Sequence, residues 1–278
     1  MRDYSITTII IIIKFERILI SIITMTEFTL TKTYDIHAIK ASVASKAINK
    51  DECDKLISLY RAVNKNKTLT TTYAQKDKCG RYYPSGDNKS FADAYMWKHT
   101  RASLSLNELD IDAVNCAQTI FCALCEQAGL SVDYVRRAVD NREFFIDKLD
   151  INQADIDHHN KVNQNTADKR GIAKQFFSGI LNNGGRNLWK TLDLTHDIVI
   201  KGSEVHELVK EIKRLKTSLL SFDKYADVKK QYGDKAIFHI ITDAEANVTT
   251  DLIKIFQQNL IQVTSFIYDG FQVRCMDK

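Results

Sequence analysis

The chain closes on the stretch QVTSFIYDGFQVRCMDK, residues 262–278, and this stretch decides the fold class. Two runs of β-branched and aromatic residues, SFIY and FQV, meet at Asp269-Gly270. Asp-Gly between such runs is the strongest short-range hairpin signal, because both residues tolerate positive φ. The stretch therefore predicts a β-hairpin. Asp269 is then either a turn residue alone or the polar tip of a buried hairpin that holds a metal ion.

The composition is that of an ordinary globular protein. The chain has 278 residues, 44% hydrophobic and 27% charged, which is enough for one large domain or two small ones. A net charge of +4 permits a nucleic-acid partner but does not by itself indicate one. Six cysteines include a C-x-x-C pair, Cys122 and Cys125, inside a helix-like stretch. No second pair follows at zinc-ribbon spacing, so we expect free buried thiols.

The N-terminus begins with the apolar stretch ITTIIIIIKFERILISIIT, residues 6–24. Lys14, Glu16 and Arg17 divide it into runs that are shorter than the roughly 20 apolar residues of a membrane span. We interpret residues 1–24 as a dispensable apolar extension, with a membrane or targeting role as the alternative. No stable membrane association is expected.

The elements alternate in an order that favours an α+β fold. The strand-like stretches are TLTTTYA, GRYY, LNELDIDAV and the closing hairpin, so the strands come from distant parts of the chain. Residues 152–166 are polar and predict an approach to the next helix. Helical periodicity and helix start signals predict helices over 36–64, 114–130, 131–149, 166–183, 203–222 and 241–258, the last capped by Thr242 or Asp243 with Glu245 in its first turn.

Two carboxylates lie on the strand that precedes the helical middle. Strand alternation in LDIDAV places Asp110 and Asp112 on one face. Two carboxylates on one face repel each other unless a cation lies beside them, and Mg²⁺ prefers one or two carboxylates with waters and phosphates. With Asp269, they form a candidate two-metal site. The alternative is that they are strand-end residues or a helix N-cap.

Positive side chains are spaced to meet an anion. Arg170 and Lys174 in DKRGIAKQFF lie at i, i+4, so both project from one helix face. A triphosphate would satisfy both cations, whereas the alternative is a solvated helix face. Arg101, in HTRASL, is a further positive group just before the Asp strand.

These elements, in this order, resemble a divergent family A DNA polymerase of the type found in virophages and transpovirons of giant viruses. LDIDAVNCAQTIF is similar to the first palm motif, RGIAKQFFSGILNNGG to the fingers motif, and IYDGF to the third motif. GRYYPSG and TRASL stand where such proteins carry a Gly-Arg stretch and an Arg before the first motif. The resemblance covers residues 76–278.

The resemblance implies a particular α+β architecture, a polymerase palm-like antiparallel sheet with a helical fingers insertion, incomplete at the C-terminus. It divides the chain into the extension 1–24, a helical N-terminal region 25–75 and a palm/fingers domain 76–278. Later palm strands and a helicase do not follow the third motif, so the chain is expected to be a fragment of a larger viral replication protein.

The resemblance also implies a DNA-directed DNA polymerase, a nucleotidyltransferase with Mg²⁺ or Mn²⁺ as cofactor. Asp269, with Asp110 or Asp112, would hold two metal ions. Asp110 is favoured because Asn115 falls five residues later, where the family's Glu lies near the incoming sugar. Asp112 remains possible because it is closer to the strand end.

Arg170, Lys174, Asn115 and Arg101 would bind the incoming dNTP, and the DNA primer–template would be the main partner. A helicase domain or a separate C-terminal chain would be a further partner. The expected location is intracellular, in the host cytoplasm or viral factory.

Two departures from the family leave alternatives open. Tyr268 replaces the His of the third motif, and the fingers tyrosine has no match near Asn182 and Asn183. The first alternative is an inactive polymerase remnant that binds DNA weakly. The second is an unrelated α+β protein that carries these motifs by chance.

Overall fold

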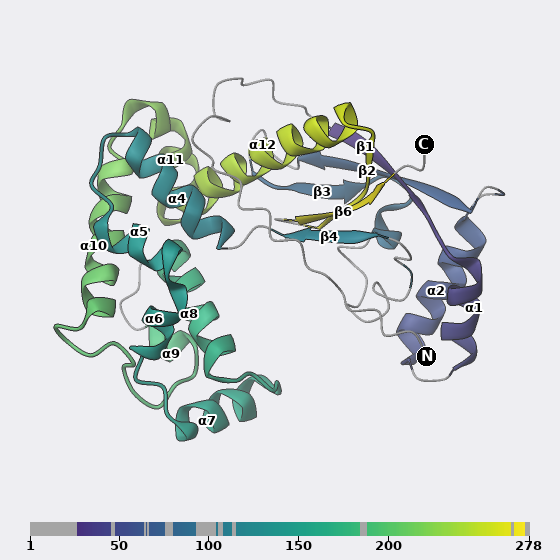
Figure 1. The fold of residues 1–278 in the computed structure, drawn as a ribbon. Helices are drawn as coiled ribbons and strands as arrows, with labels where there is room; N and C mark the ends of the chain where they lie inside the picture. The colour runs from purple at the N-terminus through teal and green to yellow at the C-terminus, as the bar shows by residue number, and fades with distance from the viewer. Residues whose placement is uncertain are drawn as a thin grey trace. The chain divides into compact units, whose positions relative to one another are not determined.

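The strands come from the first and last parts of the chain and the helices mostly from its middle, so the fold is mixed α+β, as predicted (Figure 1). The computed structural model describes residues 27–45, 48–63, 65, 67–75, 80–92, 104, 108–112, 115–183, 188–267 and 270–275. Two three-stranded antiparallel sheets are present among these residues.

The helices and strands have the following bounds. The strands are β1 (Glu27–Thr33), β2 (Thr68–Gln75), β3 (Tyr82–Ser85), β4 (Leu109–Asp112), β5 (Ile261–Ile267) and β6 (Gly270–Cys275). The α-helices are α1 (Ile36–Ala44), α2 (Lys50–Ala62), α4 (Cys116–Gln127), α5 (Asp133–Asp140), α6 (Arg142–Asp147), α7 (Gln153–Asn163), α8 (Lys169–Asn183), α9 (Leu188–Thr191), α10 (Glu204–Leu219), α11 (Ala226–Tyr232) and α12 (Ala236–Gln258). Short 3₁₀ helices are η2 (Lys89–Phe91), η4 (Asp223–Tyr225) and η5 (Gly233–Lys235).

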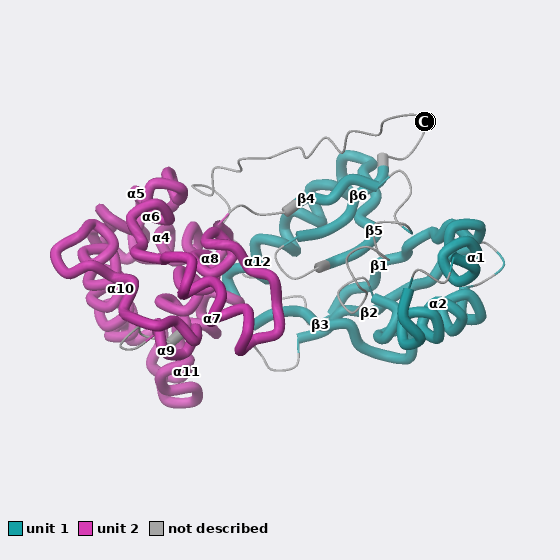
Figure 2. The backbone as a smooth tube through the Cα atoms, turned by 90° about the horizontal axis from the view of Figure 1, so that it is seen from below, with its two compact units in different colours: residues 1–114, 243–278 teal, residues 115–242 magenta. Residues whose placement is uncertain are grey.

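The chain divides into two compact units, which Figure 2 shows in two colours. Unit 1 comprises residues 1–114 and 243–278, and unit 2 comprises residues 115–242. Unit 2 is a helical insertion between β4 and β5, and its second boundary falls inside α12. The region 25–75, predicted as a helical N-terminal region, contains β1 in addition to the predicted strand β2, and it lies in the same unit as the closing hairpin.

The first sheet has the order β1-β2-β3. β1 alternates between exposed and buried positions, which buries Phe28, Leu30 and Lys32 on one face. The strands predicted in TLTTTYA and GRYY are confirmed as β2 and β3. Pro84 lies in β3, at the edge of the sheet, where a residue without an N–H is tolerated.

The second sheet has the order β4-β6-β5 and contains the predicted hairpin. A bulge between Val263 and Ser265 shifts the register of β5. Ile267 pairs with Gly270, so Gly270 is already a strand residue and the connection is Tyr268-Asp269. The expected turn at Asp269-Gly270 is thus displaced by one residue. Tyr268 and Asp269 themselves lie outside the described residues.

An aromatic cluster forms the core of unit 1. Phe266 of β5 packs edge-to-face against Phe28, Tyr73 and Tyr82, with ring centroids 5.8, 5.6 and 6.4 Å away. Such pairs stabilise beyond their buried area. The C-terminal part of α12 covers this core, and its Ile253 is buried in the same cluster (Figure 1).

The structure corrects three helix predictions. The segment 36–64 forms two helices, because Asn49 caps α2 by accepting a hydrogen bond from Glu52 N. The polar segment 152–166 contains a helix, α7, which begins with a reciprocal capping box between Asn152 and Asp155. α12 begins at Ala236, so Asp243 is not a cap. Local capping hydrogen bonds therefore determine helix boundaries that hydrophobic periodicity alone misplaces.

Smaller differences concern the middle of the chain. The predicted helix 131–149 is interrupted at Asn141, whose side chain caps α6 by accepting from Phe144 N. None of the described helices is both long and apolar enough to cross a membrane. Residues 1–24, whose role was left between a dispensable extension and a targeting segment, lie outside the described part of the chain.

The aromatic core generates a stability prediction. Phe266→Ala should lower the free energy of unfolding by about 3–5 kcal/mol, because the truncation leaves a cavity among three rings. Ile255→Ala, at a position 45% exposed on α12, should change it by less than about 0.5 kcal/mol. Urea unfolding followed by circular dichroism compares the two variants, and equal effects would contradict the assigned core.

Candidate active site at the β4–β6 pair

The candidate site begins with the antiparallel pairing of β4 and β6. In this register Asp112 pairs with Gly270, and Asp110 pairs with Gln272. The last residue of β4 is Asp112, and the first residue of β6 is Gly270. The first carboxylate strand therefore lies beside the second strand of the closing hairpin, although the whole of unit 2 separates them in the chain.

Two of the predicted site residues cannot be placed. Asp269 and Arg101 lie outside the described residues. Asp269 directly precedes Gly270 in the sequence. Its proximity to Asp110 or Asp112 stays a prediction, while the pairing of its neighbour Gly270 with Asp112 is observed.

Asp110 is exposed, but its carboxylate is held by the neighbouring strand. Gln272 Nε2 donates a hydrogen bond to Asp110 Oδ1 over 2.8 Å. Gln272 is only 2% exposed, and its backbone carbonyl accepts a hydrogen bond from Thr264 Oγ1 at 3.3 Å. A buried amide therefore anchors one oxygen of an exposed carboxylate.

The other end of the Gln272 amide contacts a buried lysine. Lys32 Nζ donates to Gln272 Oε1 over 2.7 Å. Lys32 comes from β1, so the contact joins the two sheets of unit 1. A second link, from Gln262 Nε2 to the carbonyl of Thr31 at 3.1 Å, ties β5 to the same strand.

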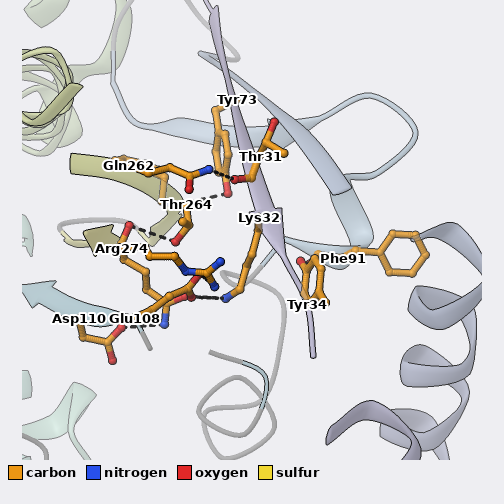
Figure 3. Close-up of polar contacts among 12 residues, drawn as sticks. Thr31, Lys32, Tyr34, Tyr73, Phe91, Glu108, Asp110, Gln262, Thr264 and Arg274 are labelled. Atoms are coloured by element: carbon orange, nitrogen blue, oxygen red, sulfur yellow. Dashed lines mark hydrogen bonds and ion pairs between the residues drawn. The ribbon is translucent and has the colours of Figure 1, made fainter. Parts of the chain in front are cut away.

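Glu108 balances the buried charges. Its side chain is fully buried and lies 3.1 Å from Lys32 Nζ and 3.2 Å from the Arg274 guanidinium (Figure 3). Burying a charge without a partner costs several kcal/mol, and these two ion pairs provide partners for the buried Glu108 carboxylate. Asp110 is linked to Lys32 indirectly, through the amide of Gln272.

Sequence reasoning missed Lys32, Glu108, Gln272 and Arg274. The available signal is alternation: 108, 110 and 112 are acidic at every second position, and Gln272 and Arg274 are polar at matching positions in β6. Lys32 continues the buried face of β1 after Phe28 and Leu30. Only the pairing of strands shows that these polar positions meet.

The donor chemistry of β4 fits a divalent cation. Carboxylate oxygens are the ligands that Mg²⁺ prefers, and Asp110 presents one at the surface. Glu108 is instead engaged by Lys32 and Arg274. Within the described residues, no group of three or more His, Cys, Asp or Glu side chains could hold a metal ion. Asp269 is not among these residues, so the metal site of Asp110, Asp112 and Asp269 stays a prediction.

Asn115 belongs to unit 2 and has a local structural role. It adopts a left-handed conformation, with φ of 53°, immediately before α4. Its Oδ1 accepts from Arg142 at 2.5 Å, and its Nδ2 donates to the carbonyl of Val139 at 3.3 Å. Burial lowers the pKa of Arg142. The amide thereby connects α4 to α5 and α6, and its predicted contact with the incoming sugar stays a prediction.

Arg170 and Lys174 lie on α8, the helix that the sequence predicts for them. Arg170 pairs with Glu143 at 2.6 Å, and both side chains are more than half exposed. Lys174 is exposed. The opposite face of α8 is buried through Ile172 and Phe176. The helix therefore presents cations to solvent, and their contact with a triphosphate stays a prediction.

The Gly-Arg stretch before β3 is held against α12. Arg81 makes a bidentate ion pair with the buried Glu245, with N–O distances of 2.8 and 2.9 Å. Gly80 N donates to Asp243 Oδ1 at 3.1 Å. Burial raises the pKa of Asp243, and this carboxyl in turn adds to the raised pKa of Tyr82, whose main cause is burial. These contacts fix the start of β3.

The predicted free thiols are confirmed where the structure describes them. Cys53, Cys116, Cys122 and Cys125 are free, and the last three are buried. Burial raises the pKa of Cys122 and of Cys125 to about 12. The thiolate is the reactive and metal-binding form, and these raised pKa values keep the C-x-x-C pair as thiols near neutral pH.

Comparison of the chain with protein-family models, with curated proteins and with solved structures found no match. The functional proposal therefore rests on the β4–β6 pairing and on the polar side chains around it.

The buried charge network generates a second prediction. Glu108→Gln should lower the free energy of unfolding by about 3 kcal/mol, because it removes the carboxylate that pairs with the buried Lys32 ammonium and the partly buried Arg274 guanidinium. Glu143→Gln removes an exposed ion pair and should cost at most about 1 kcal/mol. Urea midpoints at low and high salt distinguish the two, and a Glu108→Gln midpoint equal to the wild type would contradict the network.

Proposed function

We propose that this chain is a template-directed DNA polymerase of the family A type, which transfers nucleotides to a DNA primer with the help of two metal ions. The proposal assigns the β4–β6 pair to the palm and the helical unit 2 to the fingers. Its substrates are a DNA primer–template and dNTPs.

One observation carries the proposal: β4 ends at Asp112, and its register pairs Asp112 with Gly270, the residue after Asp269. Paired residues of antiparallel strands have Cα atoms about 4.5–5.5 Å apart. A two-metal site needs carboxylates from two elements that meet in space. Had β4 and the closing hairpin lain in different sheets, their carboxylates could not have met in this way.

The register favours Asp112 over Asp110 as the partner of Asp269. Asp110 pairs with Gln272, two residues further along β6, and each strand residue advances about 3.3 Å. Asp110 also has one oxygen engaged by Gln272. We therefore assign Asp112 and Asp269 as the closest pair of ligands, with Asp110 as the additional carboxylate.

The helical insertion supports the fingers assignment. Unit 2 lies between the two strands of the site in the sequence, and α8 carries Arg170 and Lys174 on exposed positions. The exposed pair between Arg170 and Glu143 is worth at most about 1 kcal/mol. Arg170 can therefore exchange Glu143 for a phosphate at small cost, since charge-assisted bonds to phosphate are stronger.

The residues of this chain then have distinct roles. Asp110, Asp112 and Asp269 supply carboxylates, and Lys174 and Arg170 bind the triphosphate of the incoming nucleotide. When bound, two Mg²⁺ or Mn²⁺ ions stabilise the attacking and leaving oxygens of nucleotidyl transfer. The proposal gives Asn115 no direct part in the chemistry, because its amide already bonds within unit 2.

The decisive experiment is primer extension by the full chain in Mg²⁺ or Mn²⁺. Asp269→Asn and Asp112→Asn should each reduce extension by about 100-fold or more, because even partners behind a metal ligand are worth 10–100-fold. Asp110→Asn should have a smaller effect. Product lengths on sequencing gels measure all three variants.

Asp157→Asn is the matched control, an exposed aspartate of α7 whose loss should leave extension unchanged. Equal activity of Asp269→Asn and the wild type would refute the catalytic assignment. Metal-independent DNA binding without extension in the wild type would instead identify a catalytically inactive remnant.

A second experiment tests the nucleotide site. Lys174→Ala should weaken dNTP binding by roughly 10-fold while DNA affinity changes less than about twofold, because a charge-assisted bond contributes about 1.5–3 kcal/mol. Fluorescence polarisation with labelled dNTP and labelled primer–template measures both. Gln175→Ala, at the adjacent exposed position, is the control. An unchanged nucleotide affinity in Lys174→Ala would argue against its role.

A further inference from the structure

Gln272 lies between a buried lysine and an exposed carboxylate. Its Oε1 accepts from Lys32 Nζ at 2.7 Å, and its Nε2 donates to Asp110 Oδ1 at 2.8 Å. The amide therefore forms a short relay of hydrogen bonds from the interior of unit 1 to the surface of β4.

Lys32 determines which way this amide points. An ammonium group has hydrogen-bond donors only, so it can contact the oxygen of an amide but not its NH₂ group. The reversed amide would place NH₂ against Nζ of Lys32 and oxygen against the carboxylate of Asp110. Lys32 therefore obliges Gln272 to donate to Asp110.

Lys32 is itself held in place. It is 3% exposed, it pairs with Glu108 at 3.1 Å, and its Nζ lies 5.7 Å from the centroid of the Tyr34 ring. The backbone of Gln272 is fixed by pairing with Asp110 and by the hydrogen bond from Thr264. The relay thus starts from a buried lysine that its contacts hold in place, and not from a flexible surface side chain.

We propose that Gln272 and Lys32 are positioning residues that hold the Asp110 carboxylate in one orientation toward a divalent cation. Within the described residues, no donor contacts Asp110 Oδ2, so Oδ1 is anchored and Oδ2 is presented. Partners behind a metal ligand fix its orientation in this way. The inference rests on the proposed function, because it needs a cation at this carboxylate.

The test measures Mn²⁺ binding to the full chain by electron paramagnetic resonance of the free ion, which requires no enzymatic activity. Gln272→Met removes the contacts of the amide with Lys32 and with Asp110 at similar side-chain length. It should raise the Mn²⁺ dissociation constant by about 10-fold or more. Gln262→Met makes the same change on β5, where the amide binds the Thr31 carbonyl, and should leave the constant within about twofold.

The Lys32→Met variant distinguishes a positioning role of Lys32 from the effect of its positive charge alone. Removing a cation near a metal site strengthens metal binding if charge alone matters. Positioning predicts the opposite, a weaker Mn²⁺ affinity, because Lys32 then no longer holds the Gln272 amide in the orientation that donates to Asp110. Tighter or unchanged binding in Lys32→Met would overturn the proposed relay.

Thermal unfolding by circular dichroism shows which variants fold. If Gln272→Met does not fold, Gln272→Asn replaces it, because the shorter amide cannot contact both Lys32 and Asp110, and the same weakening is expected. Wild-type affinity in the folded Gln272 variant contradicts the inference.

The Asp110→Asn variant distinguishes failure of the Gln272–Lys32 relay from failure of the proposed metal site. If it weakens Mn²⁺ binding while the Gln272 and Lys32 variants do not, the relay is wrong and the carboxylate site stands. If the wild type binds no Mn²⁺, or Asp110→Asn has no effect, Asp110 is not a ligand, and both the relay and that part of the proposed function fall.

Discussion

The ladder between β4 and β6 is the constraint on which the rest of unit 1 depends. It joins two segments that the whole helical unit separates in the chain, and it does so in one register because a one-residue slip would reverse every side chain. That register places Ile111 against the aromatic core and Asp110 at the surface. The same pairing sets the end of β4 beside the start of β6.

The polar side of this ladder is organised by charge balance rather than by packing. Glu108 is fully buried between Lys32 and Arg274, and the Gln272 amide bonds both Lys32 and Asp110. Buried charges persist only when they are paired and hydrogen-bonded. A network of this kind favours one arrangement of two sheets, and it leaves one carboxylate of β4 at the surface, where a cation could bind.

Local signals predicted much of the chain. The closing hairpin, β2, β3, α8 and α10 follow from alternation, helical periodicity and capping residues, as does the α+β class. Many errors fall at element ends, while β1 and α7 were missed as whole elements. Asn49, Asn141 and the Asn152–Asp155 box begin helices that periodicity had merged or missed, and the apolar start of α12 extends seven residues before Asp243.

The sequence by itself determined which residue types are available: three aspartates on strand-like segments, two cations one helical turn apart, and a Gln and a Lys with no evident task. Only the tertiary structure decided that Lys32, Gln272 and Asp110 form one chain of contacts, and that Asp112 pairs beside the hairpin end. The physical reason is that strand alternation is local, whereas strand partners are chosen by burying one shared apolar face. No spacing along the chain encodes that choice.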